Sequence, residues 1–382
     1  MSWTSTTLAQ HPLGPLAHRV LEAALRAVDP RALCRAWATE HLHDAQRIRL
    51  FAMGKAACAM ASGVLDVAGP RVVGGLAVAK HPGELGGIPL LLGHHPTPTQ
   101  ASLDAGNAML QAVSEAEAGD TVVALISGGT SALLEAPIDG VSLADIVEHT
   151  RARLRDGTSI EVLNAERRAM SRLKGGGLAR AVPRGVTTHA VVLSDVLGGD
   201  VHTVGSGPFD APHVTAHLLA DNTTAVAAAA AAARDAGADV DITPPVRGEA
   251  RVEGVRWAQA RMTAPPTDAV RCTIVGGETV VTVRGHGRGG RNQEFALAAA
   301  PALMGNPHAL LATLATDGED GPTDAAGAVV DGTTVPRALE RGLDPDDHLR
   351  RNDAYRFFDA LDDLLRPGPT GTNVCDLAVL FS

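Results

Sequence analysis

The sequence predicts an α/β protein in which helices cover parallel β-sheets. From residue 48 to residue 196, short apolar runs such as IRLFAM and TVVALI alternate with stretches of helical periodicity, an order typical of parallel strands joined by crossover helices. The 382 residues allow two or three domains of ordinary size. A segment at 238–270 that lacks periodicity and contains paired prolines predicts a boundary between two of them.

The elements follow in a regular order. Apolar residues recur at spacings of three and four over 13–40, and the pattern breaks at Asp29 and Pro30, which can cap and start a second helix. The alternation of strands and helices, including a helix over TSALLEA, continues to the strand HAVVLSDV. An alanine-rich helix begins near Asn222 and ends at Gly237, and we expect it to serve packing. Strand and helix patterns resume at RCTIVGGETVVTV and end in CDLAVLFS.

Bulk properties favour a small substrate. The formal net charge of −10 and the absence of long runs of like charge argue against nucleic acid or an anionic membrane as a partner. No apolar stretch approaches the roughly 18 residues that span a bilayer, and the N-terminus lacks a signal pattern, so we expect a cytoplasmic protein. The four cysteines form no CxxC pair, which argues against a zinc site or a disulfide framework.

Two predicted strand-to-helix junctions carry candidate anion-binding residues. SGGTS at 127–131 would let backbone amides approach a phosphate or carboxylate, although an ordinary tight turn explains the motif equally well. FAMGKAA at 51–57 places Lys55 at the carboxyl end of a strand, where open α/β sheets bind ligands. Among 33 Lys and Arg residues only Lys55, Lys80 and Lys174 are lysine, which favours a lysine-specific role over a solubilising charge.

A third motif, RGHGRGGRNQE at 284–294, follows a predicted strand and precedes an apolar helix. It matches GxGxxG formally, but no acidic residue lies about 20 positions further on to bind the ribose of a dinucleotide. Its three arginines among glycines suit a multiply charged phosphate at least as well.

Carboxylates at predicted strand ends suit a metal–nucleotide site, because Mg²⁺ prefers a few carboxylates together with phosphate oxygens and water. These carboxylates are Asp195, Glu278, Asp317, Glu319, Asp320 and Asp324, although turn and cap chemistry also explains exposed Asp-Gly pairs. We expect Asp195 and Asp317 to matter most. In HHPTP, adjacent histidines on a strand would point to opposite faces, so we expect a structural turn there, with His95 the one closer to a ligand.

With these motifs in order, the chain resembles the class II glycerate 2-kinases, a family with an N-terminal glycerate-kinase domain and a C-terminal MOFRL domain. The resemblance runs from about residue 48 to the end. Its matching blocks are GKAACAM, HHPTPTQASLDAG, LISGGTSALLEAP, LNAERRAMSRLKGGGLA, VVLSDVLGGDVHTVGSGPF, GGETVVTVRGHGRGGRNQEFAL, ATDGEDGPTDAAGAVVDG and GPTGTNVCDL.

The resemblance implies two three-layer α/β domains. The N-terminal one, at 1–245, would be Rossmann-like with a mainly parallel sheet, and the MOFRL domain, at 246–382, would have a mixed sheet. Helices of 1–45 could pack on the second domain. The implied reaction is the phosphorylation of D-glycerate to 2-phospho-D-glycerate by ATP and Mg²⁺, in a cleft between the domains.

The resemblance also implies the roles of individual residues. The catalytic lysine falls on Lys55 and the catalytic arginine on Arg291, while Asp195 would hold metal or accept the hydroxyl proton. Asp317 would be a second metal ligand. Because Gly199 replaces an acid of the family pattern, Asp195 or Asp200 would take over its work. The residues expected to bind substrate or nucleotide are Ser127, Gly128, Gly129, Ser131, Lys174, Glu278, Gly289, Asn292, Glu294 and Asp317.

Two other functions stay open at this stage. An NAD(P)H-dependent hydroxypyruvate reductase is disfavoured because the sequence lacks a full nicotinamide fingerprint. A non-catalytic sugar-phosphate-binding module is weakened by the absence of a helix-turn-helix pattern or a basic patch. The sequence leaves open the exact acceptor hydroxy acid and the assembly, for which a homodimer is one option.

Overall fold

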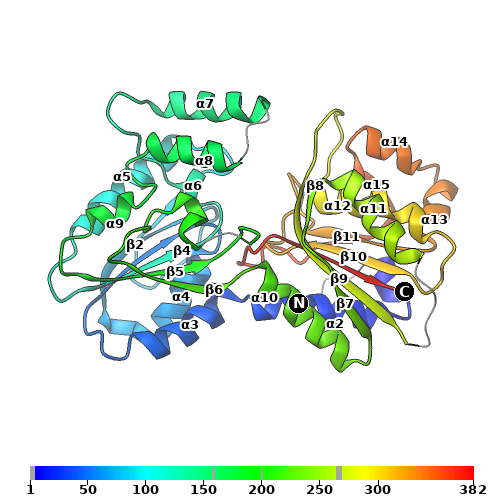
Figure 1. Ribbon diagram of the computed structural model, residues 1–382, viewed down its shortest axis with the longest axis horizontal. Helices are drawn as coiled ribbons and strands as arrows, with labels where there is room; N and C mark the ends of the chain where they lie inside the picture. Colours follow the sequence, from blue (N-terminus) through cyan, green and yellow to red (C-terminus); the bar gives the residue numbers. More distant parts are fainter. Residues whose placement is uncertain (1–4, 157–159, 199–200, 264–268) are drawn as a thin grey trace. The chain divides into compact units, whose positions relative to one another are not determined.

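The computed structural model describes residues 5–156, 160–198, 201–263 and 269–382, which form two compact units (Figure 1). We call them the lysine unit and the arginine unit, after Lys55 and Arg291. The lysine unit comprises Asp29–Asp221 and Gly371–Asn373, and the arginine unit comprises Met1–Val28, Asn222–Thr370 and Val374–Ser382. Gly199 and Asp200, which bear on the metal prediction, lie outside the described residues, as does the Pro-rich part of the predicted connector at 264–268.

The lysine unit is built on a six-stranded sheet in the order β3-β2-β1-β4-β5-β6, with every pair of neighbours parallel. Its strands are β1 (Ile48–Met53), β2 (Val72–Ala79), β3 (Leu90–Leu92), β4 (Thr121–Ile126), β5 (Thr187–Leu193) and β6 (Thr215–Ala220). This is the strand order of Rossmann sheets. The predicted Rossmann-like parallel sheet is therefore confirmed.

Helices cover both faces of this sheet, which gives the three predicted layers. Helices α3 (Pro30–His41) and α4 (Ala57–Ala68) lie on one face, and α5 (Gln100–Ser114) and α9 (Gly177–Ala181) lie on the other (Figure 1). The unit also contains α6 (Thr130–Leu133), α7 (Leu143–Arg155), α8 (Ile160–Ala169) and the 3₁₀ turns η1 (Gly69–Arg71) and η2 (Val201–Ser206). Apolar side chains of β1, β4 and α5 fill the core between sheet and helices.

Two local predictions have different outcomes. The Asp29–Pro30 boundary is confirmed, because the Asp29 carboxylate accepts hydrogen bonds from the amides of the first turn of α3. The helix expected over TSALLEA is shorter than predicted and ends at Leu133. Its last residue, Ala136, precedes Pro137, and a residue before proline is disfavoured in helical conformation.

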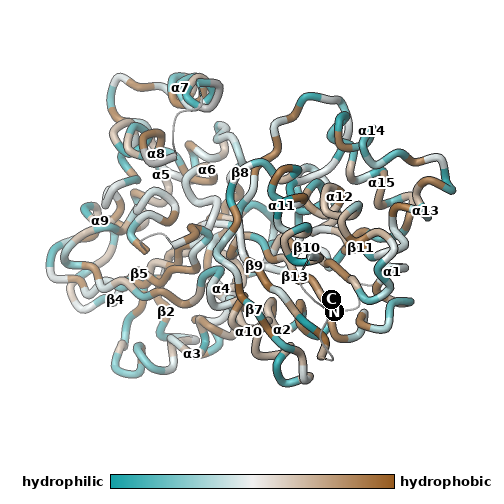
Figure 2. The backbone as a smooth tube through the Cα atoms, turned by 45° about the vertical axis from the view of Figure 1, so that its right-hand side comes forward, coloured by the Kyte–Doolittle hydropathy of each residue, from teal (hydrophilic) through white to brown (hydrophobic). Residues whose placement is uncertain are grey.

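The arginine unit contains a mixed seven-stranded sheet with the path β12-β11-β10-β13-β9-β7, and β8 also pairs with β9. Its strands are β7 (Asp239–Ile242), β8 (Val246–Glu249), β9 (Arg271–Val280), β10 (Leu310–Ala315), β11 (Gly327–Asp331), β12 (Leu364–Leu365) and β13 (Asp376–Phe381). The strands β7 and β8 run parallel to β9, whereas the other neighbours are antiparallel. The predicted mixed sheet is confirmed, and hydrophobic residues mark the strands of both sheets (Figure 2).

Helices also cover both faces of the mixed sheet. Helices α2 (Gly14–Ala27) and α10 (Asn222–Asp235) lie on one face, and α11 (Ala250–Met262), α12 (Arg291–Leu303) and α15 (Ala354–Leu361) lie on the other (Figure 1). The remaining helices are α1 (Thr6–Gln10), α13 (Thr334–Glu340) and α14 (Pro345–Arg350). The alanine-rich helix α10 packs on α2 through buried alanines, as predicted.

The compact units group the chain differently from the predicted ranges 1–245 and 246–382. Helix α10 and strand β7 precede residue 245 but belong to the arginine unit, because α10 packs on β9 and β7 pairs with β9. The consecutive helices α2 and α3 belong to different units. Within the described ranges, no helix is long and apolar enough to cross a membrane.

Candidate functional site

Two turns of the lysine unit, which follow β1 and β4, are joined by hydrogen bonds. The amide of Lys55 donates to the carbonyl of Gly128 at 2.9 Å, and the amide of Ala56 donates to the hydroxyl of Ser127 at 3.0 Å. Gly54 has a φ of +113°, and a Cβ at this position would lie 2.2 Å from the Ser127 hydroxyl. The glycine is therefore required for both conformation and space, and the two turns form one platform.

This platform lies where the strand order reverses. Strands β2 and β3 lie on one side of β1, and strands β4, β5 and β6 lie on the other. Open α/β sheets bind ligands outside the carboxyl ends of their strands at such a reversal. Lys55 and the SGGTS turn, both predicted from sequence, occupy this position.

Lys55 and His95 lie over Gly129. A Cβ at Gly129 would lie 3.2 Å from Lys55 Cγ and 3.4 Å from His95 Cδ2. Gly129 has a φ of +85°, a conformation that glycine adopts without strain. The turn thus brings the side chains of Lys55 and His95 together beside a partly buried backbone turn, an arrangement that could bind an anion.

Asp195 and Asn373 lie over Gly128. A Cβ at Gly128 would lie 1.9 Å from Asp195 Oδ2 and 2.4 Å from Asn373 Nδ2. The Asn373 amide donates to Asp195 Oδ2 at 3.2 Å. The predicted residues Lys55, Gly128 and Asp195 therefore lie close together, and Asn373 joins them.

The side chains of Ser127 and Lys174 are buried and form hydrogen bonds with other groups of the lysine unit. The buried Ser127 hydroxyl donates to the carbonyl of Met53 at 3.3 Å, so it links the two turns. Lys174 is 2% exposed and donates to the carboxylate of Glu135, which is also buried. Burial lowers the pKa of Lys174 to about 8, although Glu135 opposes this shift. Lys174 is thus already paired with an anion of the protein.

Arg291, the first residue of α12, is held by carboxylates. Its Nε donates to Asp376 Oδ2 at 2.6 Å and its Nη2 donates to Asp376 Oδ1 at 3.0 Å, which makes a bidentate pair. Its Nη1 lies 3.4 Å from Glu278 Oε1. Burial opposes the charge of Arg291, but Asp376 more than offsets it, so the pKa of Arg291 is raised. The guanidinium is therefore a fixed cation, and its side chain is 33% exposed.

Asp320 fixes the helix start that carries Arg291. Its carboxylate accepts hydrogen bonds from the amides of Asn292 at 3.0 Å and Gln293 at 2.9 Å. Complete burial raises the pKa of Asp320 to about 7, although these two amides favour its ionised form. The sequence placed Asp320 among several carboxylates without this role.

Asn222 positions the strand that carries Asp376. The sequence predicts it as a helix cap, but its side-chain amide donates to the carbonyls of Val374 at 2.8 Å and Asp376 at 2.9 Å. Cys375 between them has a φ of +67°, which is strained for a residue other than glycine. Its carbonyl accepts a hydrogen bond from the Thr316 hydroxyl at 2.7 Å, which helps to hold this conformation.

The amides of the glycine-rich loop at 284–290 are largely satisfied by the protein. Asn352 Oδ1 accepts from the amides of Arg284 at 2.8 Å and Gly285 at 3.0 Å. Asp353 Oδ1 accepts from the Arg288 amide at 2.9 Å, and the Gly287 amide donates to a carbonyl at 2.9 Å. These amides do not form a phosphate cradle, so the loop's contribution to charge comes from its arginine side chains.

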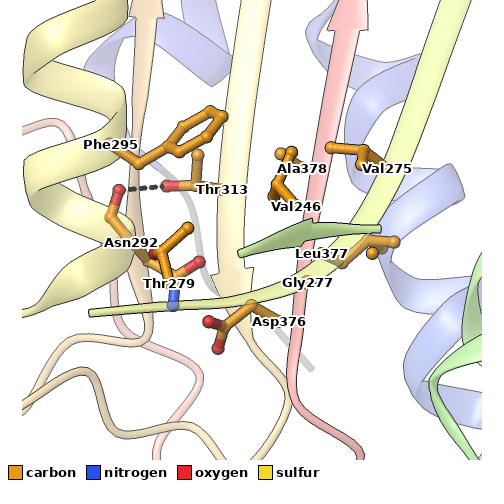
Figure 3. Close-up of a pocket in the computed structure, with 11 residues that line it drawn as sticks. Val246, Val275, Gly277, Thr279, Asn292, Phe295, Thr313, Asp376, Leu377 and Ala378 are labelled. Atoms are coloured by element: carbon orange, nitrogen blue, oxygen red, sulfur yellow. Dashed lines mark hydrogen bonds between the residues drawn. The ribbon is translucent and has the colours of Figure 1, made fainter. Parts of the chain in front are cut away.

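Three further residues of the arginine unit were expected to bind substrate or nucleotide, and each has a different environment. Glu294 is 2% exposed and binds Arg251 at 2.8 Å and Asn352 at 3.0 Å, so it stabilises the loop. Gly289 lies against the start of α15. Asn292 lines a pocket with Asp376, between α12 and the sheet (Figure 3).

Asp195 and Asp317 are the predicted metal ligands, and each belongs to a different unit. Among the described residues, no group of three or more His, Cys, Asp or Glu side chains could hold a metal ion. The described residues therefore provide no closed set of metal ligands. Asp195 and Asp317 suit an ion such as Mg²⁺, which keeps several waters and binds one or two carboxylates together with substrate phosphates.

The sequence missed Asp376 and Asn373 as site residues. Both lie in the block GPTGTNVCDL, which carries the family resemblance, but no local pattern separates them from turn residues. Asp376 lies 85 positions from Arg291, and Asn373 lies 178 positions from Asp195. Their proximity arises from the fold.

Comparisons with known proteins agree with this architecture. Residues 16–236 match the family described as "Domain of unknown function (DUF4147)", and residues 271–376 match the MOFRL family. The chain is 35% identical to D-glycerate 2-kinase of Thermotoga maritima, over 96% of this chain and 98% of that protein. A relative in Agrobacterium vitis, provisionally named a hydroxypyruvate reductase, is 34% identical over 100% of this chain and 96% of its own.

A solved structure is similar as well. The crystal structure of glycerate kinase from Thermotoga maritima superimposes with a TM-score of 0.85 at 34% identity, and covers 96% of this chain and 98% of its own. The similarity therefore extends over both units and is not restricted to one motif.

Proposed function

The chain belongs to the class II glycerate 2-kinase family, and from this membership we propose that it transfers a phosphoryl group from ATP to D-glycerate, giving 2-phospho-D-glycerate. The observation that carries the proposal is the identity of 35% to a D-glycerate 2-kinase over 96% of the chain. The geometry supports it, since Lys55 and Arg291 are both held beside groups suited to a charged substrate.

The proposed mechanism rests on positioning and charge. In phosphoryl transfer, negative charge spreads over the transferred oxygens, and the protein mainly orients the reactants and neutralises that charge. We assign this work to Lys55 and Arg291, so that each unit contributes one cation to the reaction. Asp195, whose carboxylate lies over Gly128, is our candidate to accept the hydroxyl proton of glycerate.

We expect Mg²⁺ to accompany ATP. Asp195 and Asp317 would be its protein ligands, and a bound ion would neutralise charge on the nucleotide phosphates. The carboxylate of Asp317 accepts a hydrogen bond from the amide of Glu319 at 3.1 Å, which fixes its orientation within the turn.

The loop geometry argues against a dinucleotide cofactor. In dinucleotide-binding proteins the GxGxxG loop joins a parallel strand to a helix, and its backbone approaches the pyrophosphate. Here the loop follows β9, and its amides donate to the side chains of Asn352 and Asp353. The motif at 284–294 is therefore a structural loop that presents Arg291.

The decisive experiment is a coupled assay of ADP formation with the purified chain. We expect ADP to form only when ATP, Mg²⁺ and D-glycerate are all present, with 2-phospho-D-glycerate as the product by mass spectrometry and NMR. L-Glycerate and other hydroxy acids test acceptor selectivity. Oxidation of NADH or NADPH by hydroxypyruvate at 340 nm, without ADP formation from glycerate, would instead establish the reductase.

A further inference from the structure

A pocket of the lysine unit next to the SGGTS turn contains charged and polar groups with no role in the mechanism above. Its lining residues are Met53, Thr130, Ser131, Leu134, Leu173 and Lys174, with Leu178, Gly205 and Pro208.

Arg167 of α8 contacts one residue of this pocket. Its Nη2 donates to the carbonyl of Ser131, a lining residue, at 3.1 Å. Its Nε is buried and makes no hydrogen bond within the described part of the chain. A buried donor without a partner is rare in native proteins and requires an explanation, such as a ligand.

Among the side chains that the structure describes, the charges around Arg167 do not balance. Glu135 is the carboxylate that faces it, but Glu135 already accepts hydrogen bonds from Lys174, from the Ser171 hydroxyl at 2.5 Å and from the Ala136 amide at 3.1 Å. The pair of Lys174 and Glu135 is therefore neutral. The charge of Arg167 remains, and one monovalent anion would cancel it.

Two hydroxyl groups lie beside the same carbonyl. Ser131 Oγ and Ser206 Oγ are 3.0 Å apart and share a hydrogen bond, so one of the two hydroxyl protons remains to be donated to an anion. Ser206 has a φ of +66°, a left-handed conformation that is uncommon outside glycine. Such strain occurs often at ligand sites, where the surrounding structure holds it.

We propose that Arg167, together with the hydroxyls of Ser131 and Ser206, binds the carboxylate of the hydroxy-acid substrate. The planar guanidinium fork matches a carboxylate, and its single charge matches a monoanion better than a triphosphate. The proposal rests on the proposed function, because the substrate is taken to be a small hydroxy acid. It assigns the carboxylate to the lysine unit and leaves Arg291 to act on the phosphoryl group.

The neighbouring arginine has a different environment. Arg168 also has a buried Nε without a partner in the described ranges, but its guanidinium lies beside Gly207 and Asp210. Asp210, whose carboxylate lies 3.2 Å from His202 Nδ1, is therefore a neighbour of Arg168 on this side. This difference is why the subsite is assigned to Arg167.

The test compares Arg167→Gln and Arg167→Lys with the wild-type protein and with Arg172→Gln. Arg172 is an exposed arginine nearby in the sequence and serves as the control. We expect Arg167→Gln to raise the KM for D-glycerate by about 30-fold or more, because a buried anion would lose its ionic partner. The KM for ATP should stay within about threefold, and Arg167→Lys should retain part of the affinity.

Binding measured by calorimetry adds a readout that does not require turnover. Wild-type protein should bind D-glycerate more tightly than the uncharged analogue glyceramide, and Arg167→Gln should lose this preference. An active Arg167→Gln variant with unchanged KM for D-glycerate, or with a raised KM for ATP alone, would overturn the carboxylate subsite. If wild-type protein binds hydroxy acids but forms no ADP, the proposed kinase activity fails and the subsite stands. If it binds no small carboxylate, the subsite fails.

Discussion

The two units hold their cations in contrasting ways. In the lysine unit, Lys55 follows Gly54 at the end of a parallel strand, and glycine turns bring it beside His95 and Asp195. In the arginine unit, Arg291 starts a helix and is clamped by Asp376 in a bidentate pair. Glycine turns thus set where the lysine leaves the backbone, and a bidentate carboxylate pair fixes the guanidinium of the arginine.

The difference follows from the chemistry of the two cations. A lysine ammonium is a compact charge on a flexible stem, so its position depends on the backbone below it and on the space that glycines leave. A guanidinium is planar and can be fixed directly by a carboxylate through two parallel hydrogen bonds. Substitutions at the two sites should therefore lower activity for different reasons.

The largest effect should come from removal of either cation. We expect Lys55→Ala and Arg291→Ala each to lower kcat/KM by about 100-fold or more, since each removes charge stabilisation from the phosphoryl transfer. The coupled ADP assay measures this loss, with Arg184→Ala, an exposed arginine, as the control. If either variant stays within about threefold of wild type, that residue is not part of the catalytic machinery.

Asp376→Asn should have the next largest effect. It tests whether Arg291 depends on a carboxylate for its position. The amide removes the charge of the clamp, and a hydrogen bond to a charged group contributes about 1.5–3 kcal/mol, so kcat should fall by about 10-fold or more. The KM for D-glycerate should change much less. Asp376→Glu retains the charge and should recover part of kcat. An Asp376→Asn enzyme with normal kcat would show that Arg291 needs no clamp.

Gly128→Ala tests the glycine turn of the lysine unit. The added Cβ would lie 1.9 Å from Asp195 Oδ2, so Asp195 and Asn373 must move. We expect the free energy of unfolding to fall by about 1–3 kcal/mol, as for overpacking in other cores, and kcat to fall with it. Gly86→Ala is the matched control, because nothing lies within 4 Å of its added Cβ. Equal activity of Gly128→Ala and Gly86→Ala would contradict the close approach of Asp195 to Gly128.

The smallest effect concerns stability alone and comes from a cluster of aromatic side chains in the lysine unit. His217 lies against Trp37, His41 and His189, with Glu40 as the opposing charge. Burial, followed by the charges of His189 and His41, lowers the pKa of His217 to about 4. The unfolded chain therefore binds more protons as pH falls from the ordinary histidine pKa of about 6.5 toward 4.

Stability should consequently be complete above about pH 6.5 and should decline as pH falls toward 4. Because His217 is partly exposed, we expect a loss of about 1–2 kcal/mol from this group. Urea unfolding at pH 7 and pH 5 measures it, and His217→Asn should reduce the pH dependence. The exposed His43→Asn is the control. The same pH slope in wild type and His217→Asn would exclude His217 as the cause.

Much of the fold could be predicted from sequence, because its signals are local. Alternating apolar runs and helical periodicity predicted the parallel sheet, and Asp29–Pro30 predicted the start of α3. The helix over TSALLEA was wrong in length, since the carboxyl-terminal half is extended before Pro137. Part of the site was also local, because Lys55 and the SGGTS turn both follow strands.

The partners of these residues could not be predicted in the same way. Lys174 was expected to bind a ligand, and the structure adds that it is paired with Glu135 within the core. The glycine-rich loop matched GxGxxG formally, and only the structure shows that Asn352 and Asp353 accept hydrogen bonds from its amides. In each case the deciding contact comes from a residue distant in sequence, and hydrophobic periodicity carries no information about it.

The sequence by itself determined the parallel sheet and the order of the motifs, because periodicity, glycine and charge are properties of short segments. The family resemblance implied the mixed sheet and the roles of Lys55 and Arg291. Only the tertiary structure decided that Asp376 clamps Arg291, that Asn373 joins Asp195, and that Arg167 is left with an unused buried donor. Such pairings depend on how the packed strands and helices bring distant side chains within hydrogen-bonding distance.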